Sequence, residues 1–330
     1  MSIEITINLI NGPGNVPPPT PPTAPTSPTS PTPPVPAVCG RVFVGVDGTL
    51  YVIDAVTGLI IDRIELTDGS NALNVTVNPF REQVYVSTGL DRLFIILDVR
   101  TLTIVANIAL GYQVNEATYS PIDNLIYVNA GSGFIDILDG DTFEQVERIT
   151  GLNTPARVVY DSRTNYVYST NNLSNDVVVI EGTNEILRIV VGRRPNQIAL
   201  NLVTGLIYVS VSGEGSIAVI DTTTNTVIEN ISVGATPYGI AVDTITNRVY
   251  VAVSGNNVNV YDGATNQLID TLSAGGFTWG VALTPTLQRG FVTNRNSRTV
   301  SMIDLTTDEV LADIPVDGTP INITALEFIC

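Results

Sequence analysis

Apolar and polar residues alternate over short runs along most of the chain, and turn residues separate the runs. The clearest unit spans residues 236–275 and reads TPYGIAVDTITNRVYVAVSGNNVNVYDGATNQLIDTLSAG. It holds four runs rich in β-branched and aromatic residues, which are GIAV, RVYVAV, VNVYD and LIDTLSA. Such runs, bounded by Asp, Asn, Gly and Thr, are typical of β-strands joined by tight turns. The unit therefore predicts four consecutive strands.

The same unit recurs through the chain. One aromatic residue returns in the second run at intervals of 40 to 42 residues, at Phe43, Tyr85, Tyr127, Tyr168, Tyr208, Tyr250 and Phe291. Four strands in about 41 residues, repeated seven times, indicate a β-propeller. We therefore expect an all-β fold, a seven-bladed β-propeller of four-stranded blades, with strands A to D of each blade running outward from the centre.

An acidic residue ends the third run of every unit. The seven are Asp54, Asp98, Asp139, Glu181, Asp221, Asp262 and Asp304. Each begins the turn into strand D, where a short acidic side chain accepts hydrogen bonds from nearby backbone amides. We expect this structural capping role rather than a catalytic one.

The first unit is incomplete, because residues 41–67 supply only strands B, C and D. The missing strand A is present at the other end of the chain, in TPINITALEFIC, residues 319–330. Aligned with the sixth unit, Pro320 falls on Pro237 and Ile323 falls on Ile240. We expect the C-terminal strand to complete the first blade and close the ring.

The same alignment brings the two cysteines together. Cys330 falls on Asn247 and Cys39 on Thr246, the place of the A–B turn in the sixth unit. This predicts a Cys39–Cys330 disulfide in place of the turn. Two free thiols, or pairing between chains, are the alternatives. A disulfide indicates an oxidising compartment, such as the cell exterior or a spore surface.

Several strand B runs share a recognisable pattern. FVTN stands at residues 291–294, and IYVN, VYST and IYVS occupy the same place in other units. The approach to strand A reads G-x-x-P-x-x-I-A, as in GATPYGIAV and GRRPNQIAL. Over residues 41–330 the chain resembles the YVTN-repeat (YncE-like) family of seven-bladed β-propellers. The resemblance implies the fold and a surface or secreted location, and it carries over no catalytic residue.

The amino-acid composition excludes several kinds of catalytic and metal site. The chain of 330 residues has no lysine and no histidine, and all fifteen basic residues are arginine. There is therefore no imidazole base and no lysine for a Schiff base. Two cysteines are too few for a four-cysteine zinc or iron–sulfur site within one chain. The net charge of −17 argues against nucleic acid and anionic membrane surfaces as partners.

The entries of the A strands are the places where propeller ligands are expected. They hold Asn74, Glu116, Arg157, Asn196, Tyr238, Trp279 and Asn322. The seven differ from blade to blade and include no carboxylate pair or metal cluster, so we expect no cofactor and no catalytic or metal site. We expect Trp279 to line the core or the channel. Arg193 and Arg194 form the densest basic spot, either a local counter-charge or a docking point.

The N-terminal segment differs from the rest. In residues 1–10, Ile3, Ile5, Ile7 and Leu9 share one face, which is the pattern of a half-buried strand. Residues 11–38 hold twelve prolines and no charge, which favours an extended linker reaching about 80 Å. Glu4 interrupts the apolar positions that a signal peptide needs, so we expect no signal peptide. The propeller domain is assigned to residues 39–330.

A lone strand is not stable in water and needs a sheet edge. Outer strands of a propeller offer such edges, and TIVANIAL (103–110) and EILRIVV (185–191) are candidates. We therefore expect a non-enzymatic structural or interaction protein of the cell exterior. In this interpretation it assembles with itself into a filament by donating its N-terminal strand, without membrane insertion. The alternatives for the segment are a strand that folds back, another protein partner, or an unstructured tail. An enzyme or small-ligand binder that uses the central channel or the loop face is the alternative function.

Overall fold

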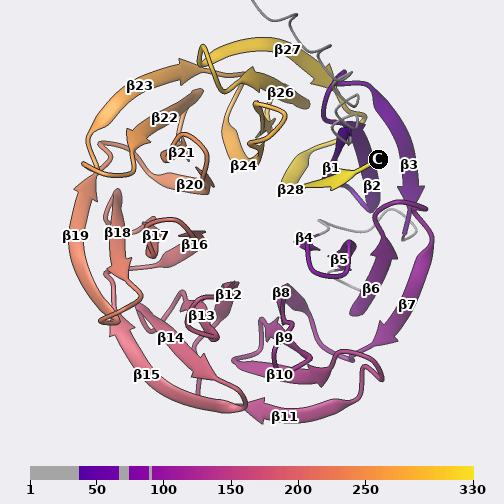
Figure 1. The fold of residues 1–330 in the computed structure, drawn as a ribbon, viewed down its shortest axis with the longest axis vertical. Helices are drawn as coiled ribbons and strands as arrows, with labels where there is room; N and C mark the ends of the chain where they lie inside the picture. The colour runs from indigo at the N-terminus through magenta and orange to yellow at the C-terminus, as the bar shows by residue number, and fades with distance from the viewer. Residues whose placement is uncertain (1–36, 67–73, 89–90) are drawn as a thin grey trace, which may run out of the picture. The chain divides into compact units, whose positions relative to one another are not determined.

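The computed structural model describes residues 37–66, 74–88 and 91–330. In these residues, 28 strands form seven antiparallel sheets of four strands each, arranged about a common centre (Figure 1). The predicted all-β, seven-bladed fold is confirmed. Among the described residues, no helix is long and apolar enough to cross a membrane.

Each blade runs from an innermost strand A to an outermost strand D. Blade 1 consists of β28 (Pro320–Ile329), β1 (Val38–Val46), β2 (Thr49–Asp54) and β3 (Ile60–Glu65). Blade 2 consists of β4 (Asn74–Asn78), β5 (Gln83–Ser87), β6 (Leu93–Asp98) and β7 (Ile104–Ala109). Blade 3 consists of β8 (Val114–Ser120), β9 (Leu125–Ala130), β10 (Phe134–Asp139) and β11 (Gln145–Ile149). Blade 4 consists of β12 (Pro155–Asp161), β13 (Tyr166–Asn171), β14 (Asp176–Glu181) and β15 (Asn184–Val190).

The last three blades repeat this order. Blade 5 consists of β16 (Pro195–Asn201), β17 (Leu206–Val211), β18 (Ser216–Asp221) and β19 (Thr226–Ser232). Blade 6 consists of β20 (Pro237–Asp243), β21 (Arg248–Val253), β22 (Asn257–Asp262) and β23 (Leu268–Ser273). Blade 7 consists of β24 (Thr278–Thr284), β25 (Arg289–Asn294), β26 (Thr299–Asp304) and β27 (Glu309–Pro315).

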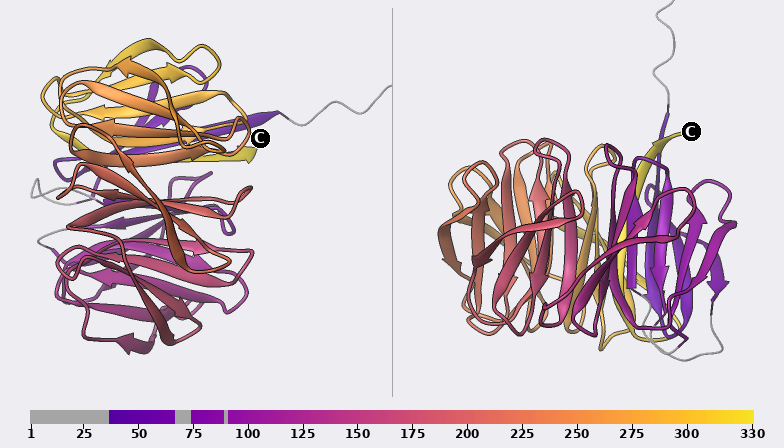
Figure 2. Two further views of the ribbon diagram at one scale, coloured as in Figure 1. Left: turned by 90° about the vertical axis from the view of Figure 1, so that its left-hand side faces the viewer. Right: turned by 90° about the horizontal axis from the view of Figure 1, so that it is seen from below.

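The ring closes as the repeat alignment predicted. The C-terminal strand β28 pairs with β1 and completes blade 1. No turn joins these two strands, and they stay paired past the place where other blades turn, with Val38 opposite Ile329 and Cys39 opposite Phe328. The Cys39–Cys330 disulfide lies at this end, which confirms the predicted bond. Figure 2 shows the end of β28 beside the beginning of β1. The compact unit begins at Ala37.

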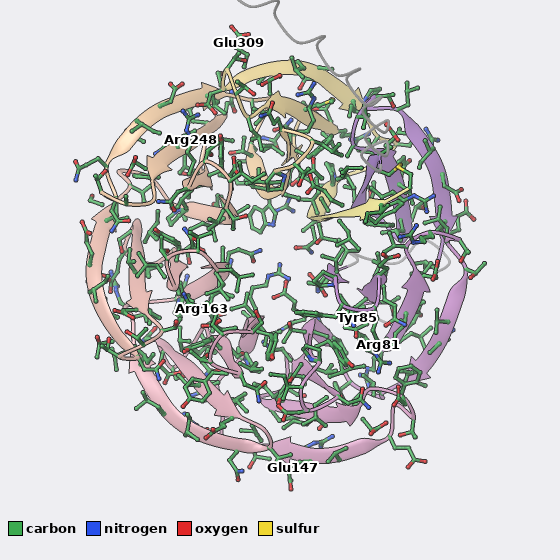
Figure 3. The ribbon with its side chains drawn as sticks, viewed as in Figure 1. Arg81, Tyr85, Glu147, Arg163, Arg248 and Glu309 are labelled. Atoms are coloured by element: carbon green, nitrogen blue, oxygen red, sulfur yellow. A yellow bond between two sulfur atoms is a disulfide. The ribbon has the colours of Figure 1, made fainter. Side chains whose placement is uncertain are left out.

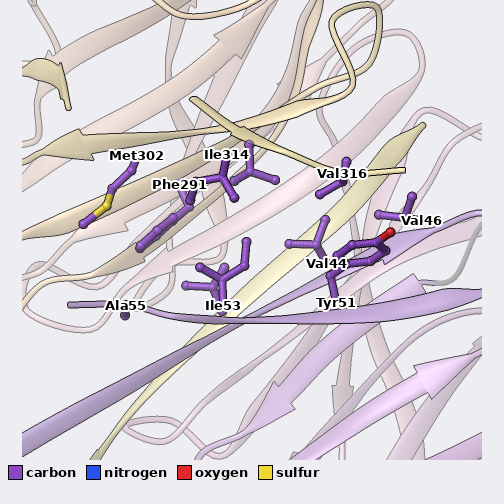
Figure 4. Close-up of a cluster of buried hydrophobic side chains, with 11 residues drawn as sticks. Val44, Val46, Tyr51, Ile53, Ala55, Phe291, Met302, Ile314 and Val316 are labelled. Carbon is purple, nitrogen blue, oxygen red and sulfur yellow. The ribbon is translucent and has the colours of Figure 1, made fainter. Parts of the chain in front are cut away.

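The core lies between neighbouring sheets. Each of the seven repeated aromatic side chains on strand B is at most 1% exposed. Figure 4 shows one such layer, in which Val44 and Ile53 of blade 1 face Phe291 and Met302 of blade 7. Full burial of one such aromatic side chain stabilises the fold by about 1.5–3 kcal/mol. The repeated aromatic therefore fills the space between two blades.

Four of the repeated tyrosines also bind the C–D turn of the following blade. The hydroxyl of Tyr127 donates to Gly182 O at 2.8 Å, and that of Tyr168 donates to Asn225 Oδ1 at 2.7 Å. Tyr208 and Tyr250 make the equivalent contacts one blade further on each time. Tyr85 departs from this pattern, because its hydroxyl accepts from Asn78 of its own blade.

Arginine side chains also form hydrogen bonds from one blade to the next. Arg81 donates to Gly140 O at 2.7 Å, Arg163 donates to Thr222 Oγ1 at 2.7 Å, and Arg248 contacts Asp308 at 2.6 Å (Figure 3). In blade 1 the aromatic is Phe43, which has no hydroxyl, and Arg41 donates instead to the carbonyls of the C–D turn of blade 2. Hydrogen bonds between neighbouring blades thus add to the apolar packing between their sheets.

The expected caps form in six of the seven C–D turns. Asp54, for example, accepts from the amides of Val56 at 3.1 Å and Thr57 at 2.8 Å. The equivalent hydrogen bonds are made by Asp98, Asp139, Asp221, Asp262 and Asp304. Glu181 departs from the expectation. It pairs directly with Asn184 across a two-residue turn, which leaves no amides for it to cap.

Candidate functional site

The seven side chains predicted at the strand A entries meet at one end of the central channel. Each lies on an innermost strand, and together those strands represent all seven blades. One hollow is lined by the side chains of Arg157, Asn196, Gln197, Tyr238, Trp279 and Asn322. We call this set the channel mouth. The two remaining entry residues, Asn74 and Glu116, do not line the hollow but contact Arg157.

Arg157 spans the channel from blade 4. Its Nη2 donates to Asn322 Oδ1 of blade 1 at 2.6 Å. Its Nη1 lies 3.3 Å from Asn74 Oδ1 of blade 2 and 3.4 Å from the carbonyl oxygen of Asn115 of blade 3. The Arg157 side chain is only 15% exposed. A buried guanidinium is therefore held mainly by neutral oxygen atoms from three other blades.

Glu116 is the acidic neighbour of this guanidinium. Its Oε1 lies 3.7 Å from Arg157 Nη1, and its Oε2 accepts a hydrogen bond from the amide of Val158 at 2.7 Å. Burial raises the pKa of Glu116 to about 7, although the charge of Arg157 opposes the shift. Part of the Glu116 population is therefore protonated at neutral pH. The positive charge of Arg157 is then incompletely balanced.

Blades 6 and 7 supply an aromatic wall. Tyr238 stacks on Trp279, with ring centroids 4.4 Å apart, and the guanidinium of Arg295 lies 4.5 Å from the Trp279 ring. The next residues are Gly239 and Gly280. A Cβ on Gly239 would lie 2.6 Å from the carbonyl oxygen of Trp279, so the close approach of β20 and β24 requires a glycine there. The aromatic wall therefore requires glycine at position 239 as well as the rings of Tyr238 and Trp279.

Beyond the channel mouth, the lining of the channel is more apolar. Two cavities of about 390 and 250 Å³ share Thr76, Glu116 and Thr324. Their apolar lining includes Val77, Ala117, Val159, Leu200, Val242, Leu283 and Ala325. These residues come later in the A strands, toward the A–B turns and the Cys39–Cys330 disulfide. The channel therefore has a polar, cationic end and a more apolar end.

Comparison with known proteins identifies the family. The sequence model of the YNCE-like beta-propeller family matches residues 14–329. The chain belongs to the YNCE-like beta-propeller family. This confirms the resemblance drawn from the repeat motifs. Among curated proteins, none matches the sequence.

Solved structures share the fold of this YNCE-like beta-propeller at low sequence identity. Apo AztD from Citrobacter koseri is 12% identical with a TM-score of 0.66, and the match covers 88% of this chain and 99% of that one. Hydrazine synthase from Kuenenia stuttgartiensis is 14% identical with a TM-score of 0.69, covering 79% and 92%. A functionally unknown protein from Desulfotomaculum acetoxidans is 14% identical with a TM-score of 0.73, covering 85% and 98%. At these identities the likeness concerns the fold alone.

The remaining predicted residues of this YNCE-like beta-propeller lie elsewhere. Ile3, Ile5, Ile7 and Leu9 fall outside the described residues. Arg193 is largely exposed, and its Nε lies 3.8 Å from Glu214 Oε1. Within the described ranges, no group of three or more acidic or cysteine side chains is placed to hold a metal ion.

Sequence reasoning missed two members of the site, Gln197 and Arg295. The repeat contains the signal for Gln197. Gln197 is one residue after Asn196 on strand A, at a position that can be compared across the blades. The seven residues at this position are Asn74, Glu116, Arg157, Gln197, Gly239, Gly280 and Asn322. Five of them are polar and two are glycine. Arg295 follows strand B, and only the fold brings it to Trp279.

Proposed function

We propose that this propeller is a non-enzymatic structural protein whose copies join through the N-terminal strand of one and an outer sheet edge of another. One observation carries the proposal. All seven sheets obtain their four strands from residues 37–330, because β28 occupies the innermost place of blade 1. Residues 1–10, which have strand patterning, are therefore not needed by any blade.

The outer strands supply the receiving edges. Among residues 37–66, 74–88 and 91–330, each strand D is paired on one side only, so these residues leave a row of backbone amides and carbonyls unpaired in each blade. Such edges are commonly protected by charged side chains. Six of the seven outer strands carry charge, and Glu147 on β11 and Glu309 on β27 point away from the ring (Figure 3).

The seventh outer strand, β7, is the exception. Its sequence IVANIA has no charged residue, and Ile104 and Val105 are 53% and 50% exposed. This supports β7 as the edge that accepts the donated strand. Of the two edges predicted from sequence, the other is β15, which carries Glu185 and Arg188. Backbone hydrogen bonds would hold the donated strand, and Ile3, Ile5, Ile7 and Leu9 would cover apolar side chains.

The resulting contact is head-to-tail. Because donor and acceptor are different surfaces, copies add one after another and form a filament unless the rotation closes a ring. The Cys39–Cys330 disulfide supports a location in an oxidising compartment, at the cell exterior or on a spore surface. The absence of lysine and the low share of charged residues, 14% of the chain, fit a durable, non-catalytic particle.

Three single substitutions in the full chain test the proposal. We expect the wild type to form concentration-dependent assemblies by sedimentation velocity and filaments by negative-stain electron microscopy. Ile5→Lys in the donor strand and Val105→Lys on β7 should both give monomers. Ile228→Lys is the matched control, since Ile228 is 53% exposed on the charged edge β19 and should not affect assembly.

The outcomes separate the two parts of the proposal. A wild type that stays monomeric at every concentration refutes assembly. Assembly that survives Ile5→Lys excludes the N-terminal strand as the donor. If Ile5→Lys abolishes assembly but Val105→Lys does not, the acceptor is an outer strand other than β7.

A further inference from the structure

Independently of assembly, we propose that the channel mouth binds the carboxylate group of a small organic acid. The group would lie against Arg157 and the amides of Asn196 and Gln197, with the apolar body of the ligand beside Tyr238 and Trp279.

The charge of the site favours an anion. Arg157 is largely buried, and its hydrogen-bond partners are neutral oxygens of Asn322, Asn74 and Asn115. The carboxylate of Glu116 lies farther away, at 3.7 Å, and outside the hollow. No acidic residue lines the hollow. Removing a cation from water is costly unless a well-placed opposite charge compensates it. A second guanidinium, that of Arg295, lies behind Trp279. The chain as a whole is strongly negative, with a net charge of −17, so these two arginines make the site an exception to its surroundings.

The shape of the hollow favours a small, flat group. The hollow has a volume of about 20 Å³, which is room for one water-sized group. Asn196 and Gln197, whose side chains are neutral amides, line it together with Arg157. A carboxylate can place one oxygen in this space while the planar guanidinium faces its edge. A neutral alcohol offers no charge to Arg157, and a tetrahedral oxyanion such as phosphate has no flat apolar part to contact Tyr238 and Trp279.

The aromatic wall supplies contact for the rest of the ligand. Tyr238 and Trp279 stack on each other and line the same hollow as Arg157. Gly239 and Gly280, which line the same hollow, have no side chains to fill it. Flat apolar groups pack well against such rings. Among small organic acids, we therefore expect an aromatic acid such as benzoate to bind more tightly than acetate.

The single tryptophan of the chain gives a direct readout. Because Trp279 is the only tryptophan and lines the hollow, intrinsic fluorescence reports on this site without a label. The full chain is titrated with sodium benzoate, sodium acetate, sodium phosphate and benzyl alcohol. We expect a saturable change with benzoate, a weaker one with acetate, and none with benzyl alcohol or phosphate. N-acetyltryptophanamide controls for collisional quenching, which does not saturate.

Variants assign the response to the named residues. Arg157→Gln should abolish it. Asn196→Asp should weaken benzoate binding by about tenfold or more, because it places a second negative charge beside the ligand. Asn196→Ser keeps the site uncharged and is the matched control, with affinity within about threefold of wild type. Arg194→Gln, on the exposed surface, should leave binding unchanged.

Several results would overturn the inference. The first is the lack of a saturable response to benzoate and acetate up to about 10 mM, the limit of a weak but specific site. The second is benzyl alcohol or phosphate binding as tightly as benzoate. The third is an Asn196→Asp variant that binds benzoate as the wild type does. The comparison of Asn196→Asp with the wild type tests anion binding even if Arg157→Gln does not fold.

Discussion

The hydroxyl of Tyr250 donates a 2.8 Å hydrogen bond to Oδ1 of Asp308, and this bond joins strand B of blade 6 to the C–D turn of blade 7. Arg248 contacts the other oxygen of the same carboxylate at 2.6 Å. Burial, followed by the hydrogen bond to Asp308, raises the pKa of Tyr250, so the phenol stays protonated and donates. The repeated tyrosine thus fills the core with its ring and ties two blades with its hydroxyl.

Replacing Tyr250 with Phe should lower the free energy of unfolding by about 2 kcal/mol, because a nearly buried carboxylate loses one of its two donors. Urea denaturation measures the change. Tyr166→Phe is the matched control, since it removes a hydroxyl that takes no part in these contacts between blades. Equal effects of the two substitutions would mean that the bond to Asp308 contributes nothing measurable.

Removing the disulfide should destabilise the fold strongly. Cys39 and Cys330 are 291 positions apart, so the bond restricts the unfolded chain greatly. The loop-entropy model gives up to about 5–6 kcal/mol for such a loop. Unfolding is measured with and without reductant, and the Cys39→Ser/Cys330→Ser variant should not respond to reductant. Two thiols that titrate in the unreduced, denatured wild type would contradict the disulfide.

Glu116 should give the protein a measurable pH dependence. Burial raises its pKa to about 7 from the ordinary value of about 4.5, so the folded protein binds this proton more tightly than the unfolded chain. The resulting contribution to stability is complete below about pH 4.5 and is lost as the pH rises through 7, with a total of about 3 kcal/mol.

The variant Glu116→Gln isolates this effect, because glutamine resembles the protonated acid at every pH. We expect the stability of the wild type relative to Glu116→Gln to fall between pH 5 and pH 8. The capping aspartates do not obscure the comparison. Backbone hydrogen bonds lower the pKa of Asp98, for example, so its contribution disappears only as the solution becomes acidic. A difference that is constant with pH would show that Glu116 is ionised throughout.

A single methyl group should disturb the aromatic wall. In Gly239→Ala the new Cβ would lie 2.6 Å from the carbonyl oxygen of Trp279 and 2.8 Å from the Cα of Gly280, so backbone must move. We expect a loss of about 1–3 kcal/mol and a shift of the Trp279 emission. Gly131→Ala is the control, because its Cβ would come no closer than 3.5 Å to a neighbour. Unchanged emission in Gly239→Ala would contradict the tight approach of β20 and β24.

The repeat made most of the fold predictable from sequence. Strand number, blade number, the capping aspartates and the partner of Cys39 all follow from aligning one unit on another. The alignment also placed Arg157 and Trp279 on inner strands. It did not show that Arg157 reaches Asn322 across the channel, because that contact depends on the diameter of the ring and on side-chain rotamers. Nor did it anticipate the tyrosine hydroxyls, whose partners lie in another blade.

The departures from the repeat have local causes. Glu181 is not a cap because its turn is shorter than the other six. Phe43 has no hydroxyl to donate, and Arg41 makes the link between blades in its place. In both cases neighbouring residues compensate for a change in the repeat, which a reading of single positions does not reveal.

Closure by β28 also sets the order in which the molecule is completed during translation. Blades 2 to 7 acquire their strands from consecutive stretches of chain, and each sheet has all its strands soon after they leave the ribosome. Blade 1 waits for residues 320–329, since until then the inner side of β1 has no partner. The earliest blade to be started is thus the last to be finished, and an incomplete chain presents an open strand edge to any chaperone or nascent neighbour.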